Sequence, residues 1–372
     1  MKKKIILIVL LVLIIAGLIT FLLLNNNGNK DNKANDQGSS TQKEEKKEEE
    51  STVEWGDYDS NDITLDKSLK ITEAGVYNLT GTIEDGYILI DTDGDVKLVL
   101  NNVNITNSNG PAILVTNANV LEIELAEDSK NYLTDGEVYS NDNADYDAVI
   151  YSKDDLILSG SGALDIKSKS YKGIVSKDTL IVNSGNYTIE TEDDGINVND
   201  IITINGGSID IKTSGDGIHA DGMIEINKGT FEIEAAEGIE ATYIVINDGE
   251  IDIYGTDDGI NASDKSEDYD IKIEINGGNI TIKMAQGDTD GVDSNGDIII
   301  NGGYINVTGQ STFDYDGTGV INGGTVICNG QTISTLPNQF GGGQGTQQPG
   351  GGDMPQGNMP PDQGGMPSRG RY

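Results

Sequence analysis

Residues 201–241 read IITINGGSIDIKTSGDGIHADGMIEINKGTFEIEAAEGIEA and contain one pattern twice. Each copy has two runs in which isoleucine or phenylalanine alternates with polar residues, joined by Asn-Gly-Gly or Asn-Lys-Gly. An acid, a glycine and an isoleucine then follow. Alternation with β-branched residues is typical of strands with one buried face. Three short strands per copy, with Asn and Gly between them, predict one coil of a parallel β-helix.

The corner asparagine recurs along the chain at intervals of 22, 22, 20, 29, 25 and 21 residues. It occupies Asn183, Asn205, Asn227, Asn247, Asn276, Asn301 and Asn322. One coil cannot bury its apolar face alone, so stacked coils must form the core. We expect Asn and Gly at the corners because both tolerate the left-handed backbone conformation. A twisted antiparallel β-sandwich is the alternative, but it does not explain the near-constant asparagine spacing.

The repeats therefore predict an all-β fold, a single-stranded parallel β-helix with coils of about 22 residues, over residues 57–336. Segments upstream of the clearest repeats fit this scheme less closely. Cys328 falls six residues after Asn322, as Ile282 and Val307 do after their own asparagines. We expect it to be a small core residue.

Two kinds of segment flank the repeats. Residues 5–24 are apolar and uncharged, follow three lysines, and would extend ~30 Å as a helix, enough to cross a bilayer. We favour an uncleaved N-terminal membrane anchor over a cleaved signal within residues 1–24, with the rest of the chain on the extracellular face. A cleaved signal would make the protein secreted.

We expect residues 25–56 to be a disordered spacer and the Gly/Pro/Gln/Met-rich residues 337–372 a disordered tail.

The charge balance narrows the classes of molecule that the protein can bind. The chain has 24 Lys and Arg against 62 Asp and Glu, a net charge of −38, and all of this imbalance falls in residues 57–336. Such a surface repels phosphate backbones, which excludes nucleic acid as a partner. One Cys and one His exclude a disulfide within the chain and a Cys/His zinc cluster. We expect a monomer.

Acids recur in register when the coils are aligned on the glycine that precedes the third predicted strand of each coil. The residue just before that glycine is Lys172, Asp194, Asp216, Glu237, Asp258 and Asp290 in turn, and two of these acids are doubled by Asp193 and Asp257. Two positions beyond the glycine come Val175, Asn197, His219, Glu240, Asn261 and Asp293, and further polar residues such as Asp221 follow.

Stacked carboxylates of this kind call for a cation. Equivalent positions of a β-helix lie about 4.8 Å apart. One carboxylate pair at that distance costs ~3.5 kcal/mol at an effective dielectric constant near 20 and ~0.9 kcal/mol in bulk water. A cation midway between two coils would lie about 2.4 Å from each oxygen, which suits calcium better than magnesium. The column thus predicts several calcium sites, with a solvated acidic edge as the alternative.

Three further residues are candidates for ligand binding. His219 lies within the acidic column, where it could serve as a base or as a partner of neighbouring acids. Two coils are longer, through Ser263–Asp270 and the residues around Gln286–Asp290, and insertions in repeat proteins tend to lie on the binding face. The first brings Lys265 and Tyr269, suited to hold a uronate and to stack on a sugar ring, although both could be ordinary loop surface.

Several motifs resemble a bacterial cell-surface family of carbohydrate-binding domain proteins. They read DVKLVLNNVNITNSNGPAILV, LAEDSKNYLTDG, AVIYSKDDLILSGSGALDI, KGIVSKDTLIV and EDDGINVND. The resemblance implies a right-handed parallel β-helix with bound calcium, similar to the family 9 pectate lyases, that binds acidic plant polysaccharide such as polygalacturonate, and cellulose. It implies calcium ligands at Asp193, Asp194, Asp216, Asp221, Asp257 and Asp258. With Glu237, Glu240, Asp290 and Asp293 of the column, these are the ten predicted ligands.

Three functions remain open at this point. The first is calcium-dependent binding of acidic polysaccharide at the cell surface. The second is a pectate lyase acting by β-elimination, which would need a lysine base beside the calcium. Lys177, Lys212 and Lys265 lie near the column, but none sits in a motif that assigns this role, so we predict no catalytic residue. The third is a structural stalk or adhesin whose coils are held together by calcium.

Overall fold

The computed structural model describes residues 53–140, 145–287 and 289–337. The predicted anchor, most of the predicted spacer and nearly all of the predicted tail lie outside these residues. Trp55–Asp57, at the end of that spacer, form the 3-10 helix η1. No helix within the described ranges is long and apolar enough to span a membrane.

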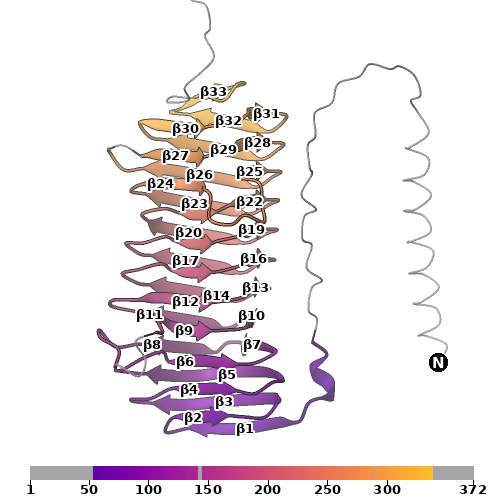
Figure 1. Cartoon of the computed structure of the whole chain (residues 1–372), viewed down its shortest axis with the longest axis vertical. Coiled ribbons are helices and arrows are strands. Elements are labelled where there is room, and N and C mark those ends of the chain that lie inside the picture. Colours follow the sequence, from indigo (N-terminus) through magenta and orange to yellow (C-terminus); the bar gives the residue numbers. More distant parts are fainter. Residues whose placement is uncertain (1–52, 141–144, 288, 338–372) are drawn as a thin grey trace, which may run out of the picture. The chain divides into compact units, whose positions relative to one another are not determined.

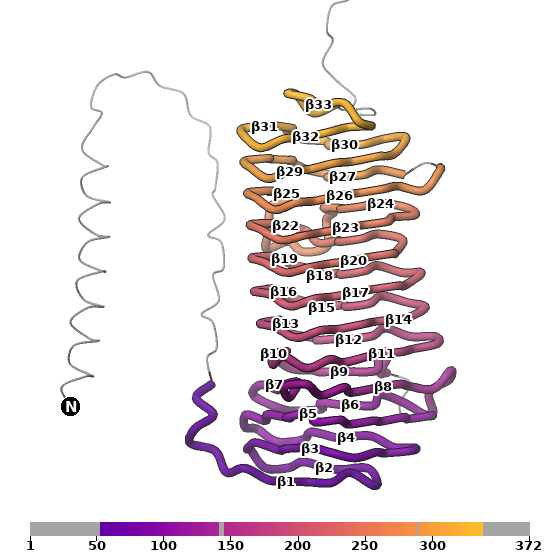
Figure 2. Tube along the Cα trace, turned by 180° about the vertical axis from the view of Figure 1, so that it is seen from behind, coloured from indigo at the N-terminus to yellow at the C-terminus, as the bar shows by residue number. Residues whose placement is uncertain are grey.

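Three strands per coil stack into a parallel β-helix of about 12 turns (Figures 1 and 2). The first column holds β7 (Val120–Leu125), β10 (Asp155–Gly160), β13 (Leu180–Val182), β16 (Ile201–Ile204), β19 (Met223–Ile226), β22 (Tyr243–Ile246), β25 (Lys272–Ile275), β28 (Asp297–Ile300) and β31 (Gly319–Ile321). The second holds β8 (Lys130–Thr134), β11 (Ala163–Lys167), β14 (Asn186–Glu190), β17 (Ser208–Lys212), β20 (Thr230–Ala235), β23 (Glu250–Gly255), β26 (Asn279–Met284), β29 (Tyr304–Thr308) and β32 (Thr325–Cys328). The third holds β2 (Leu69–Ile71), β4 (Ile88–Asp91), β6 (Ile113–Asn117), β9 (Ala148–Ser152), β12 (Lys172–Ser176), β15 (Ile196–Val198), β18 (Ile218–Ala220), β21 (Ile239–Ala241), β24 (Asp258–Ala262), β27 (Asp290–Ser294) and β30 (Ser311–Tyr315). The predicted fold is confirmed.

Long strands at the N-terminal end join the first two columns. They are β1 (Ser60–Leu65), β3 (Gly75–Ile83) and β5 (Asp95–Thr106), and β5 pairs with both β7 and β8. These columns therefore form one 22-stranded sheet, and the third column forms a separate 11-stranded sheet. At the other end, β33 (Gln331–Ile333) pairs antiparallel with β32.

Isoleucine stacks fill the interior between the sheets. Ile196, Ile218 and Ile239 pair in register along the third column, and each is at most 1% exposed. They belong to one apolar cluster that runs from Leu65 to Leu336. Cys328 pairs with Val307 and packs against this cluster, half-buried because its coil is near the end of the stack. Its predicted inward position is confirmed.

The corner asparagines form a continuous ladder of amide hydrogen bonds. Each side-chain NH₂ donates to the Oδ1 of the asparagine one coil earlier, at 2.8–3.1 Å, from Asn322 down to Asn183. Our reason for expecting Asn here was wrong, because no ladder asparagine has a positive φ. The left-handed conformation belongs to the glycine two residues later, with φ of 101° at Gly207 and 140° at Gly229.

The glycine before each third strand is needed for close approach rather than for its φ. A Cβ on Gly217 would lie 2.5 Å from the carbonyl oxygen of Gly238 and 2.5 Å from Cγ2 of Ile233. The coil therefore passes tightly over the core at this point. This close passage fixes the position of the acid that precedes the glycine.

The ladder predicts unequal effects for one substitution at two exposed asparagines. Asn276→Asp removes the donor to Asn247 and sets two acceptors against each other, which should cost about 1–2 kcal/mol. Asn183→Asp at the start of the ladder keeps the acceptor that Asn205 uses and should cost much less. Chemical unfolding monitored by circular dichroism measures the difference. Equal losses of stability in the two variants would show that the ladder does not contribute to stability.

Candidate functional site

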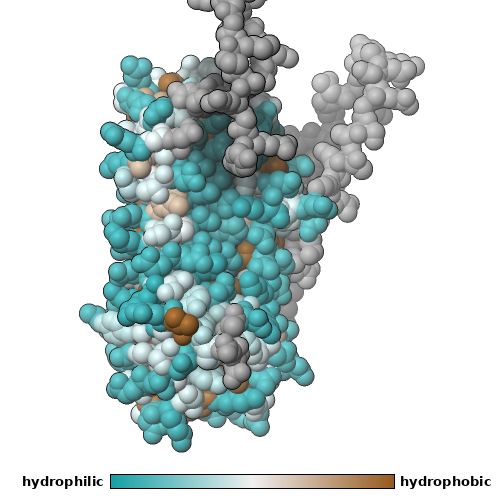
Figure 3. Space-filling model, turned by 60° about the vertical axis from the view of Figure 1, so that its left-hand side comes forward, coloured by the Kyte–Doolittle hydropathy of each residue, from teal (hydrophilic) through white to brown (hydrophobic). Residues whose placement is uncertain are grey.

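The outer face of the third column carries the predicted polar residues in register. Within β12, β15, β18, β21, β24, β27 and β30, the outward positions are Val175, Asn197, His219, Glu240, Asn261, Asp293 and Asp314. The acids that precede the glycines also align, because the N–H groups of Gly195, Gly217 and Gly238 donate to the backbone oxygens of Asp216, Glu237 and Asp258. The sequence alignment of the column is therefore correct. Figure 3 shows a face of the β-helix on which hydrophilic residues predominate.

A lysine neutralises the N-terminal part of the column. The Lys172 ammonium lies 2.8 Å from Asp193, 3.3 Å from Asp147 and 3.8 Å from Asp194. Asp194 is 9% exposed and also accepts hydrogen bonds from the Asn197 amide and the Asp216 backbone N–H. Burial raises the pKa of Asp194. The sequence placed Lys172 in the column but gave no sign that it bridges two coils.

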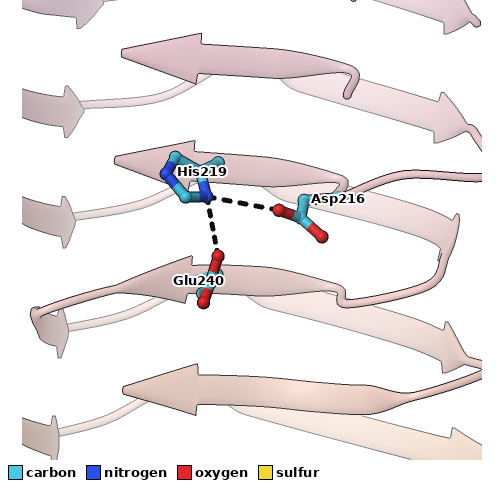
Figure 4. Close-up of side chains that lie close together, drawn as sticks. All are labelled: Asp216, His219 and Glu240. Atoms are coloured by element: carbon cyan, nitrogen blue, oxygen red, sulfur yellow. Dashed lines mark hydrogen bonds and ion pairs between the residues drawn. The ribbon is translucent and has the colours of Figure 1, made fainter. Parts of the chain in front are cut away.

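His219 occupies the middle of the column and contacts three carboxylates, two of which, those of Asp216 and Glu240, are drawn in Figure 4. Its Nδ1 lies 2.7 Å from Glu240 and 3.2 Å from Asp216, and its Nε2 lies 3.1 Å from Asp221. Burial alone would lower the pKa of His219, but these contacts raise it to about 10. The imidazolium is thus a fixed cation at neutral pH rather than a base.

Lys265 adds a second cation to this group. The long insertion folds back by one coil, since the Thr242 hydroxyl accepts the backbone N–H groups of Lys265 and Ser266. The Lys265 ammonium then lies 2.8 Å from Glu240. Burial alone would raise the pKa of Glu240, but hydrogen bonds from His219 and Lys265 lower it to about 2.

The C-terminal part of the column lacks such compensation. Burial raises the pKa of Glu237 to about 7 and that of Asp258 to about 7, and neighbouring acids add to both shifts. Burial, together with Asp290 and Asp314, raises the pKa of Asp293 to about 6. No lysine, arginine or histidine among the described residues forms an ion pair with Glu237, Asp258 or Asp293. Within the described residues these carboxylates therefore have no ion-pair partner, and the nearest basic influence is a longer-range attraction between Glu237 and Lys265.

Asn261 lies among these acids with one atom unsatisfied. The residue is 8% exposed, and its side-chain NH₂ donates to Glu237 at 2.9 Å. Its Oδ1 is buried and has no hydrogen-bond partner within the described part of the chain. A buried acceptor without a donor costs about 1–3 kcal/mol, so a missing ligand is a physical explanation for its position.

Other predicted residues lie beside these groups or apart from them. Asp257 is exposed next to Asp258, and Asp290 follows in register with Asp258. Tyr269, in the insertion before β25, lies against Gly222 two coils earlier, where a Cβ added to the glycine would be 3.0 Å from the tyrosine ring. Asp314 continues the column and was missed because Thr312 replaces the usual glycine there, which hides the repeat.

A sequence model described as “Carbohydrate-binding domain-containing protein” matches residues 65–317, more than half of the chain. The chain belongs to this carbohydrate-binding domain family. The family assignment predicted from the sequence motifs is confirmed.

One relative carries the same family description. The “Carbohydrate-binding domain-containing protein” of Acetivibrio thermocellus is 37% identical over 131 residues. The match covers 34% of this chain, and the chain spans only 46% of the relative's length. Among solved structures, a gadolinium derivative of the polysaccharide lyase-like protein from C. thermocellum is similar at 27% identity and a TM-score of 0.46. That likeness covers 71% of this chain and 96% of the solved one.

The uncompensated acids predict an unusual pH dependence of stability in a chelator. A carboxylate whose pKa is raised by folding stabilises the fold fully below its ordinary pKa, near 4, and this contribution is lost as pH rises past about 7. Asp258→Asn removes one such charge and keeps an acceptor for the Asp290 backbone N–H. In EDTA, the variant should melt at a higher temperature than the wild type at pH 8 and together with it near pH 4.

A matched variant separates this effect from the general effect of removing one negative charge. Asp252→Asn removes one acid from an exposed position of β23 on the second column. Its melting temperature should track that of the wild type across the same pH range. The interpretation fails if Asp252→Asn and Asp258→Asn stabilise the protein equally at pH 8.

Proposed function

We propose that this protein binds acidic polysaccharide of the polygalacturonate type through calcium ions held on the outer face of the third column. The observation that carries the proposal is the group of uncompensated acids around the unpaired Oδ1 of Asn261. Cellulose is a further proposed ligand. The proposed location is the cell surface, with residues 5–24 as the anchor, or the medium if they are cleaved.

The donor atoms in this region suit calcium. Glu237, Asp258, Asn261 and Asp293 offer only carboxylate and amide oxygens, which hard cations prefer. Three acids whose charged forms are disfavoured would regain their ordinary acidity beside a divalent ion. When bound, calcium would offer a coordination partner to the carboxylate of a uronate sugar.

The positions of the basic groups narrow the ten predicted ligands. Lys172 already compensates Asp193 and Asp194. His219 and Lys265 compensate Asp216, Asp221 and Glu240. Of the ten, we therefore retain five as proposed calcium ligands and add Asn261, which the sequence did not predict as a ligand. The retained residues are Glu237, Asp257, Asp258, Asp290 and Asp293.

The two lysines that form ion pairs with acids of the column, Lys172 and Lys265, argue against the lyase alternative. Burial alone would lower the pKa of Lys172 and Lys265, but their carboxylate partners raise it above the ordinary value. A general base needs a pKa near the working pH, so both are poor bases. Binding without bond cleavage is the function that this arrangement supports best.

Calcium affinity should depend on Asn261 and not on Asn197, its counterpart three coils earlier on the other side of His219. Asn261→Ala removes the unpaired oxygen and should lower calcium affinity at least about tenfold, since even outer-shell partners typically contribute 10–100-fold. Asn197→Ala removes the same group from the same strand position, where the amide also donates to an acid at 2.9 Å. Isothermal titration with calcium measures both. A similar loss in both variants would contradict the proposed location.

Polysaccharide binding should require the same ion. Polygalacturonate should bind the full-length protein in calcium and bind far more weakly in EDTA, at a temperature where circular dichroism shows the fold intact. Absorbance of unsaturated uronate, followed in the same samples, tests the lyase alternative. If EDTA melts the protein and calcium confers no glycan affinity, the stalk interpretation replaces binding.

A further inference from the structure

The outer face of the third column changes chemistry halfway along the β-helix. Before Asn197, the outward positions in register are Leu89, Leu114, Tyr151 and Val175. Leu114, Tyr151 and Val175 are buried, and the half-buried Tyr146 packs against them. An apolar and aromatic platform thus continues directly into the acidic column.

Two lysines border this platform on successive coils. Lys153 and Lys177 directly follow β9 and β12, and their backbone N–H groups donate to the preceding coil at Val115 and Ser152. Their Cα positions are therefore about 4.8 Å apart along the axis. Later coils carry Asn199 and Asp221 at the same place, so the charge at this position changes sign along the β-helix.

The two ammonium groups are held over aromatic rings. Lys153 Nζ lies 5.8 Å from the ring centre of Tyr146, and Lys177 Nζ lies 5.7 Å from that of Tyr151. The two rings meet edge to face with centres 5.0 Å apart. Neither lysine forms an ion pair within the described ranges. Among the described residues, Asp147 is paired with Lys172, and Asp145, Asp154 and Asp178 are further acids close to the two lysines in the sequence.

Adjacent unpaired cations are unexpected in a chain with 62 acids and 24 basic residues. Like charges on successive coils repel, and both lysines are exposed, where a contact with a tyrosine ring contributes only about 0.5–1 kcal/mol. An anionic ligand would relieve the repulsion. A half-buried tyrosine beside the lysines offers a flat face of the kind that contacts the C–H groups of a sugar ring.

We propose that Tyr146, Tyr151, Lys153 and Lys177, the lysine–tyrosine patch, bind a uronate residue directly, without a metal ion. The lysines pair with the sugar carboxylate, and Tyr146 contacts the ring. This inference takes its ligand class from the proposed function. The register from Val175 to Asn261 spans four coil steps, about 19 Å, so one polysaccharide chain lying along the axis can contact the patch and the proposed calcium site together.

The test compares two double variants of the full-length protein. Lys153→Gln/Lys177→Gln removes the charges of the patch. Lys167→Gln/Lys212→Gln removes the same charge from exposed lysines on the second column, which pair with Glu190 and Glu234. Titration with polygalacturonate at low ionic strength is done in EDTA and in calcium, and thermal melting confirms that each variant is folded.

We expect weak binding by the wild type in EDTA, which the patch variant reduces about tenfold, as two exposed ion pairs allow. Tyr146→Leu should reduce it too while leaving the charge unchanged. The control variant should bind like the wild type, and calcium titration alone should be unchanged in all variants. With calcium present, the patch variant should lose affinity for long chains because one of two contacts is missing.

The outcomes separate this proposal from the calcium proposal. The patch is refuted if the wild type does not bind in EDTA, if the patch variant binds like the wild type in both buffers, or if the control loses as much. Calcium-dependent binding would then be decided by the separate comparison of polygalacturonate binding in calcium and in EDTA. If calcium adds nothing to wild-type binding while the patch variant abolishes it, the patch stands and the calcium proposal fails.

Discussion

Stacking of equivalent residues about 4.8 Å apart is the constraint on which the rest of this structure depends. Any residue type repeated in register must tolerate a copy of itself above and below. Isoleucine does so by packing, and it fills the interior. Asparagine does so because its amide is both donor and acceptor, which yields the ladder from Asn183 to Asn322. Ionised carboxylates cannot, so the acidic column has to obtain cations from elsewhere.

Different basic residues neutralise the stacked carboxylates at different points along the β-helix axis. Lys172 reaches two coils at the N-terminal end of the column, and His219 in the middle is an imidazolium at neutral pH because its carboxylate partners raise its pKa. The insertion that carries Lys265 folds back to supply a further cation. Beyond these groups Glu237, Asp258 and Asp293 have raised pKa values and no ion pair with a basic residue in the described part of the chain, which is the reason to propose a metal ion there and not throughout the column.

Sequence periodicity was enough for the fold and for the alignment of the column, because both follow from the spacing of Asn, Gly and Ile. It was not enough for the pairing of charges. The contact of Lys265 with Glu240 depends on the path of an insertion that has no period. Asp314 was missed because the local motif lacks its glycine. The asparagines were placed correctly for an incorrect reason, since their role lies in side-chain hydrogen bonds and not in backbone conformation.

A net charge of −38 would seem to exclude an anionic polysaccharide as a partner, yet net charge is the wrong quantity for a ligand that lies along one face. At about 0.15 M salt the Debye length is about 8 Å, so a bound sugar senses chiefly the charges of its own coil and the next. Along the third column those local charges run from the lysine pair, through Lys172 and the imidazolium of His219, to acids that a divalent ion would neutralise. On the proposed function, a polyanion that follows this face meets a basic group or the proposed ion at successive points along the axis, although Lys172 alone faces three carboxylates. On the proposed function, affinity and calcium dependence are properties of the same column, and the remaining negative charge of the protein favours solubility.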